Sequence, residues 1–208
     1  RRGPRVQRPL CAVAMQARGD PRRGAVFGAH GHYADRVRAG FGMRVLYNSR
    51  ARRPELEESL NVEYADFESL LRESDFITIH TPLDDSTHHL FGDSQFAKMK
   101  PTAILINTAR GPIVDPVALR RALTRGTIAA AALDVTEPEP IPPDDPLLEL
   151  DNLIITPHIA SASIQTRDKM AAMAAANLIA GLKGERLPNC ANPKVYENSS
   201  RNSRNSRQ

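Results

Sequence analysis

Four apolar segments of this chain each end in polar side chains, and this arrangement restricts the folds that the chain can adopt. The segments are DFITIHTP at Asp75–Pro82, TAILINTARG at Thr102–Gly111, IAAAALD at Ile128–Asp134 and NLIITPH at Asn152–His158. Runs of this length, separated by helix-like segments, are typical of parallel strands buried on both faces of a sheet. Ligands of such sheets bind beyond the carboxyl ends of the strands. We therefore expect the polar residues at these ends to meet in one crevice. These residues are His80, Arg110, Asp134 and His158.

The remaining segments complete an alternation of strands and helices. A further strand is predicted at Met43–Tyr47. Helices are predicted at Pro54–Leu60, Asp66–Glu73, Asp93–Met99, Asp115–Arg125 and Ser163–Leu182. Most of them begin at proline or an acidic residue, as helix N-termini do. The alternation predicts an α/β fold with a doubly wound parallel sheet.

The basic charge of the chain is confined to its ends. Residues 1–23 carry +6 and residues 201–208 carry +3, so residues 24–200 carry −5 of the total of +4. We therefore expect no folded nucleic-acid-binding face, although the arginine-rich ends leave RNA or DNA binding as a weaker alternative. No apolar run approaches the roughly 18 to 20 residues of a membrane helix. We expect a cytoplasmic protein without a membrane partner.

Cysteine usage indicates neither a disulfide framework nor a metal site. Cys11 and Cys190 lie far apart, in segments with weak structural signals. Their spacing matches no metal-binding pattern, so we expect two ordinary thiols and no metal.

The segment AVFGAHG, residues 25–31, partly matches the glycine turn of dinucleotide-binding folds. That turn has the form G-x-G-x-x-G, whose glycines tighten the turn, admit a pyrophosphate and let the helix pack on the strand. Gly28 and Gly31 fill the second and third positions, while Val26 stands at the first. We predict that both glycines contact a dinucleotide. The alternative is a surface loop.

The strand at Met43–Tyr47 is followed by residues suited to a phosphate. A carboxylate at this position normally accepts hydrogen bonds from ribose hydroxyls and would repel a 2′-phosphate. Here Asn48 is neutral, and Ser49 and Arg50 offer a hydroxyl and a guanidinium. We therefore favour NADP(H) as cofactor, with NAD(H) as the alternative. A second alternative is that these residues form a solvated basic loop that binds no phosphate.

Three longer motifs, NTARGPIVD, ALDVTEPEP and ITPHIASAS, follow one another along the chain. With them the sequence resembles the nucleotide-binding domain of the D-isomer-specific 2-hydroxyacid dehydrogenases, in particular their glyoxylate/hydroxypyruvate reductase (D-glycerate dehydrogenase) subgroup. The resemblance extends over residues 40–197. It implies a Rossmann-like fold, a homodimer, and hydride transfer between NADPH and a small 2-keto acid such as glyoxylate or hydroxypyruvate.

The resemblance also implies catalytic roles. Arg110 would bind the substrate carboxylate and polarise the keto oxygen, and His158 would donate the proton. These roles suit the reaction, because hydride reaching a carbonyl carbon builds negative charge on the oxygen. Glu139 would pair with His158, and Glu137 is the competing carboxylate. Arg110 as an ordinary surface arginine is the structural alternative.

A cofactor-binding set follows from the same resemblance. Asp134 would accept a hydrogen bond from the nicotinamide carboxamide. The other residues expected to line the cofactor are His80, Thr81, Pro82, Thr108, Ala109, Ala160 and Ser161. His80 has a strong structural alternative as a strand-end histidine whose ring is satisfied within the protein. His88 and His89 are assigned to a solvated loop.

The part of the chain before the resemblance departs from the family pattern. The family's substrate-binding domain lies mostly upstream of the glycine turn, and we expect it to be largely absent here. The Arg, Pro, Gly and Ala bias of residues 1–39 is consistent with a shifted reading frame, so the N-terminal part of the fold is expected to be degenerate. The predicted division is an aberrant or disordered segment at 1–23, a dinucleotide-binding domain at 24–187 and a polar tail at 188–208.

Two functions therefore remain open. The first is an oxidoreductase, expected to be truncated, that acts on a 2-keto acid. The second is a non-catalytic dinucleotide-binding module or an inactive fragment of such an enzyme.

Overall fold

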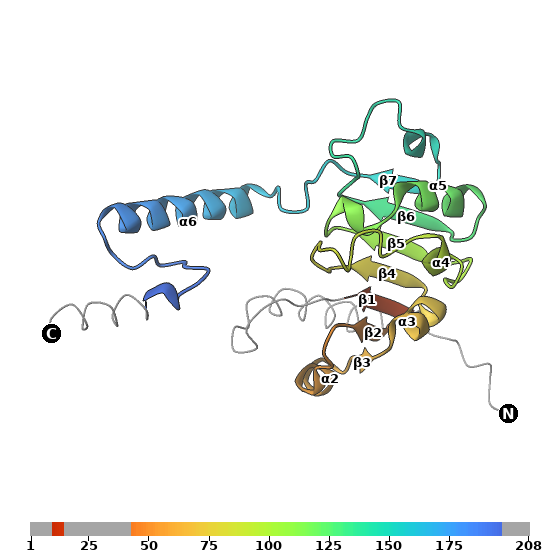
Figure 1. Ribbon diagram of the computed structural model, residues 1–208, viewed down its shortest axis with the longest axis horizontal. Helices are drawn as coiled ribbons and strands as arrows, with labels where there is room; N and C mark the ends of the chain where they lie inside the picture. The colour runs from red at the N-terminus through yellow and green to blue at the C-terminus, as the bar shows by residue number, and fades with distance from the viewer. Residues whose placement is uncertain (1–9, 15–42, 197–208) are drawn as a thin grey trace. The chain divides into compact units, whose positions relative to one another are not determined.

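A computed structural model describes residues 10–14 and 43–196 of the 208-residue chain. It divides into two compact units, one ending at His158 and the other beginning at Ile159. The first unit contains a seven-stranded sheet in the order β3-β2-β1-β4-β5-β6-β7 (Figure 1). Every strand pair is parallel. The predicted doubly wound α/β fold is confirmed, while the predicted domain boundaries at residues 23 and 187 stay predictions.

The elements lie close to their predicted bounds. The strands are β1 at Leu10–Ala14, β2 at Arg44–Asn48, β3 at Glu63–Tyr64, β4 at Phe76–Ile79, β5 at Ile104–Asn107, β6 at Ala130–Leu133 and β7 at Leu153–Ile155. The α-helices are α2 at Pro54–Leu60, α3 at Phe67–Glu73, α4 at Asp93–Phe96, α5 at Pro116–Thr124 and α6 at Ile164–Leu182. Two 3₁₀ helices are η1 at Gly111–Ile113 and η2 at Pro146–Glu149.

Strand β1 occupies the middle of the sheet. Residues 1–23 were expected to be aberrant or disordered, and this is wrong for Leu10–Ala14, which pairs with β2 on one side and β4 on the other. The uncharged run LCAVA is long enough for a strand between two neighbours, but the arginines and prolines around it obscure its signal. The order of strands reverses at β1, and such a switch point is where ligands bind to open α/β sheets. Gly28 and Gly31 lie outside the described residues.

Helix α5 shows how local sequence sets an element. The Asp115 side chain accepts hydrogen bonds from the backbone N–H groups of Val117 and Ala118, so it caps the first turn. Pro116 follows at the first helical position, where a missing N–H has no consequence. Beyond the helix, Gly126 adopts φ 66°, a left-handed conformation that glycine adopts without strain.

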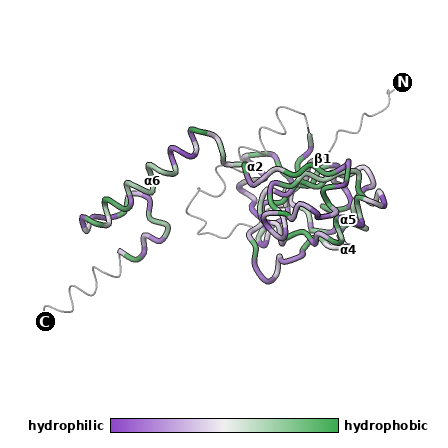
Figure 2. The backbone as a smooth tube through the Cα atoms, turned by 90° about the horizontal axis from the view of Figure 1, so that it is seen from above, coloured by the Kyte–Doolittle hydropathy of each residue, from purple (hydrophilic) through white to green (hydrophobic). Residues whose placement is uncertain are grey.

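The core lies between the sheet and the helices packed on it. Helices α4 and α5 contact each other on one face of the sheet (Figures 1 and 2). Fully buried apolar side chains come from strands, helices and loops alike, and the largest of them include Phe91, Phe96, Leu46, Leu70, Leu71, Ile77, Ile79, Leu105, Ile113 and Leu119. In Figure 2 the strands of the sheet are predominantly coloured as apolar. Burial of strands on both faces explains why they read as apolar runs.

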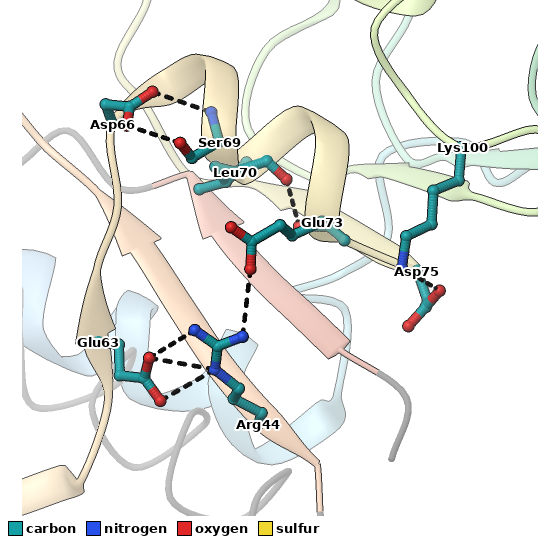
Figure 3. A network of polar contacts seen from close by, with 9 residues as sticks. Arg44, Glu63, Asp66, Ser69, Leu70, Glu73, Asp75 and Lys100 are labelled. Atoms are coloured by element: carbon teal, nitrogen blue, oxygen red, sulfur yellow. Dashed lines mark hydrogen bonds and ion pairs between the residues drawn. The ribbon is translucent and has the colours of Figure 1, made fainter. Parts of the chain in front are cut away.

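A polar network joins the amino-terminal ends of the strands, at the edge of the sheet opposite the site described below (Figure 3). Arg44, the first residue of β2, binds Glu63 at 2.6 Å and Glu73 at 3.1 Å. Its hydrogen bond with Glu63 raises the pKa of Arg44. Lys100 binds Asp75, the residue before β4, at 2.8 Å. The two half-exposed pairs of Arg44 join β2 to β3 and α3, and each of these surface pairs contributes little stability individually.

The second unit consists mainly of α6, and Ser163 caps this helix by accepting a hydrogen bond from the backbone of Thr166. The helix ends near Gly184, and the following segment returns to it through paired hydrogen bonds between Asn177 and Asn189. Within the described part of the chain, no helix has both the length and the apolar character needed to cross a membrane. The predicted homodimer stays a prediction.

Candidate active site

The carboxyl ends of strands β4 to β7 lie level with one another. Ile79 stands opposite Asn107, Asn107 opposite Leu133, and Leu133 opposite Ile155. Because all four strands are parallel, the residues that follow them emerge at one edge of the sheet. The carboxyl ends of these strands therefore lie at one shared edge, while the meeting of the four polar residues in one crevice stays a prediction.

His158 and Glu139 are in direct contact at this edge. The His158 Nδ1 atom lies 2.6 Å from Glu139 Oε1, and Glu139 Oε2 accepts a hydrogen bond from the backbone N–H of Thr136. The hydrogen bond from His158 is the main cause that lowers the pKa of Glu139 below its usual range, and the Arg110 charge contributes in the same direction. Both side chains are about half exposed, so a substrate can reach them.

The competing carboxylate has a different partner. Glu137 lies on the same loop as Glu139, but its Oε2 atom is 2.7 Å from the Nε2 atom of His89, on the loop after β4. The geometry therefore selects Glu139 as the partner of His158, as the sequence motif indicated.

The backbone of His158 has an uncommon conformation. Its φ is 54°, in the left-handed region that few residues other than glycine adopt. The preceding segment is anchored, because the Thr156 N–H donates to Leu133 and its hydroxyl donates to Asp134 at 2.5 Å. Such backbone outliers cluster at functional sites, where surrounding structure holds them in place.

Asn107 positions the turn that carries Arg110, and the sequence analysis assigned it no role. Its side chain is fully buried, donates to the backbone carbonyl of Arg110 at 2.8 Å and accepts from the N–H of Ala109 at 3.0 Å. These bonds close the chain after β5 into a fixed turn. The sequence did contain a signal for this role, because Asn107 places an amide at the end of an apolar strand. A buried amide needs hydrogen-bond partners.

The predicted cofactor-lining residues of the first unit follow strands that end at this edge, and their burial is unequal. Asp134 and Thr81 are buried, and the Asp134 N–H donates to the carbonyl of Asn107. The His80 ring lies 2.9 Å from the Thr78 hydroxyl, as its structural alternative predicts. The residues Pro82, Thr108 and Ala109 directly follow β4 or β5, while Ala160 and Ser161 belong to the second unit.

The residues after β2 form a compact loop at its carboxyl end. The Asn48 side chain donates to the carbonyl of Ala65, and the Ser49 hydroxyl donates to the carbonyl of Ala51. The exposed Arg50 guanidinium binds Asp84 at 2.7 Å, on the loop that follows β4. The predicted phosphate-binding guanidinium is therefore engaged with a carboxylate in this structure.

Tyr47 supports that loop and provides a test at alkaline pH. Its hydroxyl donates to Glu57 at 2.8 Å and accepts from the N–H of Arg53 at 2.7 Å. Burial raises the pKa of Tyr47 from 10.0 to about 12. The raised pKa means that the folded state favours the protonated Tyr47 hydroxyl. Its contribution to stability is therefore fully present below pH 10 and is lost as the pH rises through 12.

We therefore expect the free energy of unfolding of the wild type to fall relative to that of Tyr47→Phe between pH 10 and 12, by on the order of 2 kcal/mol. Urea unfolding of both proteins at several pH values measures this difference. An offset between them that is independent of pH would contradict the assignment.

Comparison with known proteins identifies the family of this chain. Residues 25–160 match the family model described as D-isomer specific 2-hydroxyacid dehydrogenase, NAD binding domain. The chain belongs to this dehydrogenase family. The match covers both glycines of the partial turn and all three proposed catalytic residues.

Relatives of this chain include the glyoxylate reductase of Korarchaeum cryptofilum, 54% identical over 76% of the chain and 48% of that enzyme. The glyoxylate/hydroxypyruvate reductase B of Escherichia fergusonii is 52% identical over 78% of the chain and 50% of that enzyme. The structure of D-lactate dehydrogenase with NAD+ from Lactobacillus jensenii superposes with a TM-score of 0.73, at 32% identity, over 88% of this chain and 56% of that chain. The chain thus spans about half the length of these relatives.

Proposed function

We propose that the chain carries the catalytic groups of an oxidoreductase that transfers hydride from NADPH to a small 2-keto acid, such as glyoxylate or hydroxypyruvate. The observation that carries this proposal is the 2.6 Å contact between His158 and Glu139 at the carboxyl edge of the sheet, within the electrostatic influence of Arg110. The names of the relatives support the substrate class, since they are glyoxylate and glyoxylate/hydroxypyruvate reductases.

The proposed roles follow from charge development during reduction. Bound NADPH supplies the hydride. The Arg110 guanidinium holds the substrate carboxylate and polarises the keto oxygen, which becomes negative as the carbonyl carbon is reduced. The Nδ1 atom of His158 is engaged by Glu139, so we assign proton donation to Nε2. Glu139 is a positioning residue that fixes the imidazole.

The residues at the edge fit a dinucleotide. Asp134 is a buried acceptor directly after β6, two strands along from β4, and we propose that it would accept a hydrogen bond from the nicotinamide carboxamide of a bound cofactor. The strand order reverses beside β4, which places the switch point next to Thr81 and Pro82. We propose that these residues, with Thr108 and Ala109, line the cofactor.

NADP(H) is the cofactor we propose, with NAD(H) as the alternative. Ser49 and Arg50 lie at the carboxyl end of β2. Residues 49–54 include no carboxylate that would repel a 2′-phosphate. The Asp84 carboxylate competes for Arg50, and its pKa of about 2 keeps it ionised at neutral pH. A bound 2′-phosphate would have to displace it.

Asp84→Asn tests this competition. We expect the variant to bind NADPH more tightly, by about three- to tenfold, because a phosphate no longer competes with a carboxylate for the guanidinium. The amide oxygen still accepts the Ser86 N–H bond that shapes the turn. Affinity for NADH should not change, and Asp85→Asn, which removes the same charge from the exposed neighbouring residue, should leave both affinities unchanged. Equal tightening of both cofactors would argue against the 2′-phosphate contact.

Steady-state oxidation of NADPH in the presence of glyoxylate separates this function from the non-catalytic alternative. Turnover by the purified chain that is lost in Arg110→Ala supports the reductase. Cofactor binding, detected as a rise in melting temperature with NADPH but without turnover, supports a dinucleotide-binding module.

A further inference from the structure

His88, His89 and Glu137 form a cluster that the proposed reduction does not use. One ring nitrogen of each histidine and one carboxylate oxygen all lie within 4.8 Å of one another. The Nε2 atom of His89 is 2.7 Å from Glu137 Oε2, and the Nε2 atom of His88 is 3.7 Å from Oε1. The two rings stack with centroids 4.0 Å apart, so both present nitrogen atoms toward the same carboxylate.

The fold holds the two sides of the cluster in place. His89 has φ 50°, and its N–H donates to the carbonyl of Pro112 at 2.7 Å. Glu137 follows Thr136, whose backbone packs directly on Gly111. Both sides are therefore anchored on the segment that begins with η1. Their side chains remain 30 to 51% exposed, so an ion from solvent can reach them.

The donor set indicates the class of ligand. Imidazole nitrogen together with carboxylate oxygen suits Zn²⁺, Co²⁺, Ni²⁺ and Cu²⁺, whereas Mg²⁺ and Ca²⁺ prefer oxygen alone. In a tetrahedral zinc site the ligand atoms are about 3.3 Å apart, given metal–ligand bonds of about 2.0 to 2.1 Å. The 3.7 Å pair is close to this spacing. The 2.7 Å pair must open by roughly 0.6 Å, which a small rotation of exposed side chains provides.

We propose that His88, His89 and Glu137 bind a divalent transition-metal ion, with Zn²⁺ as the best fit, and that water completes its coordination. The bound ion would link the loop after β4 to the loop after β6. It would thereby restrain the segment that contains Glu139, two residues beyond Glu137. The site is distinct from the His158–Glu139 pair and does not depend on the proposed reductase activity.

The sequence pattern did not reveal this cluster. We expected no metal because the two cysteines have no usable spacing, and we assigned the histidine pair to a solvated loop. The third ligand lies 48 residues along the chain from His89. Only the packing of the two loops brings it within reach.

Calorimetric titration of the full chain with ZnCl₂ near neutral pH tests the proposal. The protein is purified without a histidine tag, and His30 and His32, which lie outside the described residues, are replaced by glutamine in every sample. We expect one ion to bind, to be removed by EDTA and to raise the melting temperature. His88→Asn and Glu137→Gln should each weaken binding by more than about tenfold.

His158→Gln is the matched control, because it removes an imidazole from the other histidine–glutamate pair. It should bind zinc as tightly as the parent protein. Co²⁺ absorption adds a second readout, since a low-symmetry four-coordinate site gives strong visible bands. The absence of saturable binding, affinity unchanged in both ligand variants, or binding lost in the control would each overturn the proposal.

Discussion

We expect His158→Gln to lower kcat for glyoxylate reduction by about 10²- to 10⁴-fold, the range associated with loss of a general acid. Glutamine can occupy the same space and accept or donate hydrogen bonds, but it cannot transfer a proton at neutral pH. The Nδ1 contact with Glu139 would be the first interaction lost. Because His158 is half exposed, the fold should tolerate the change.

Two further measurements separate this chemical effect from a structural one. NADPH affinity and the melting temperature of His158→Gln should match those of the wild type. Glu139→Gln should lose less activity than His158→Gln, because the imidazole remains, and its pH–rate profile should shift. Retention of more than about one tenth of wild-type kcat by His158→Gln would exclude it as the proton donor.

Gly111→Ala is expected to destabilise the fold by about 3 kcal/mol or more, a large effect for a single methyl group. A Cβ atom at this position would lie 1.9 Å from the carbonyl oxygen of Thr136 and 2.9 Å from the backbone nitrogen of Glu137. Backbone atoms cannot rotate away as a flexible side chain can. The loop after β6 would have to move, and it carries Glu139.

Chemical denaturation measures this effect, and Gly92→Ala is the matched control. The nearest atom to a Cβ at Gly92 is 3.7 Å away, an ordinary contact, so this variant should change stability by less than about 1 kcal/mol. If Gly111→Ala changed the free energy of unfolding as little as Gly92→Ala, the close approach of Gly111 to the backbone of Thr136 would be wrong.

Much of the fold could be predicted because its signals are local. Asp115, Pro116 and Gly126 mark the limits of α5 by capping and conformational preference, which depend on immediate neighbours. Strand β1 could not be predicted in the same way. Its five residues are apolar, but their assignment depends on being held between β2 and β4, which follow much later in the chain.

The sequence by itself determined the apolar strands, the caps of the helices and the order of the motifs, because each depends on residues within a few positions of one another. It also placed Arg110, Asp134 and His158 at strand ends. The tertiary structure confirmed Glu139 over Glu137 as the partner of His158, gave Asn107 its role in the turn, and joined Glu137 to the histidine pair. The two glutamate–histidine contacts join residues 19 and 48 positions apart, and such distances are set by strand register and loop packing. The Asn107 bonds are local, but they form only because the fold buries this side chain.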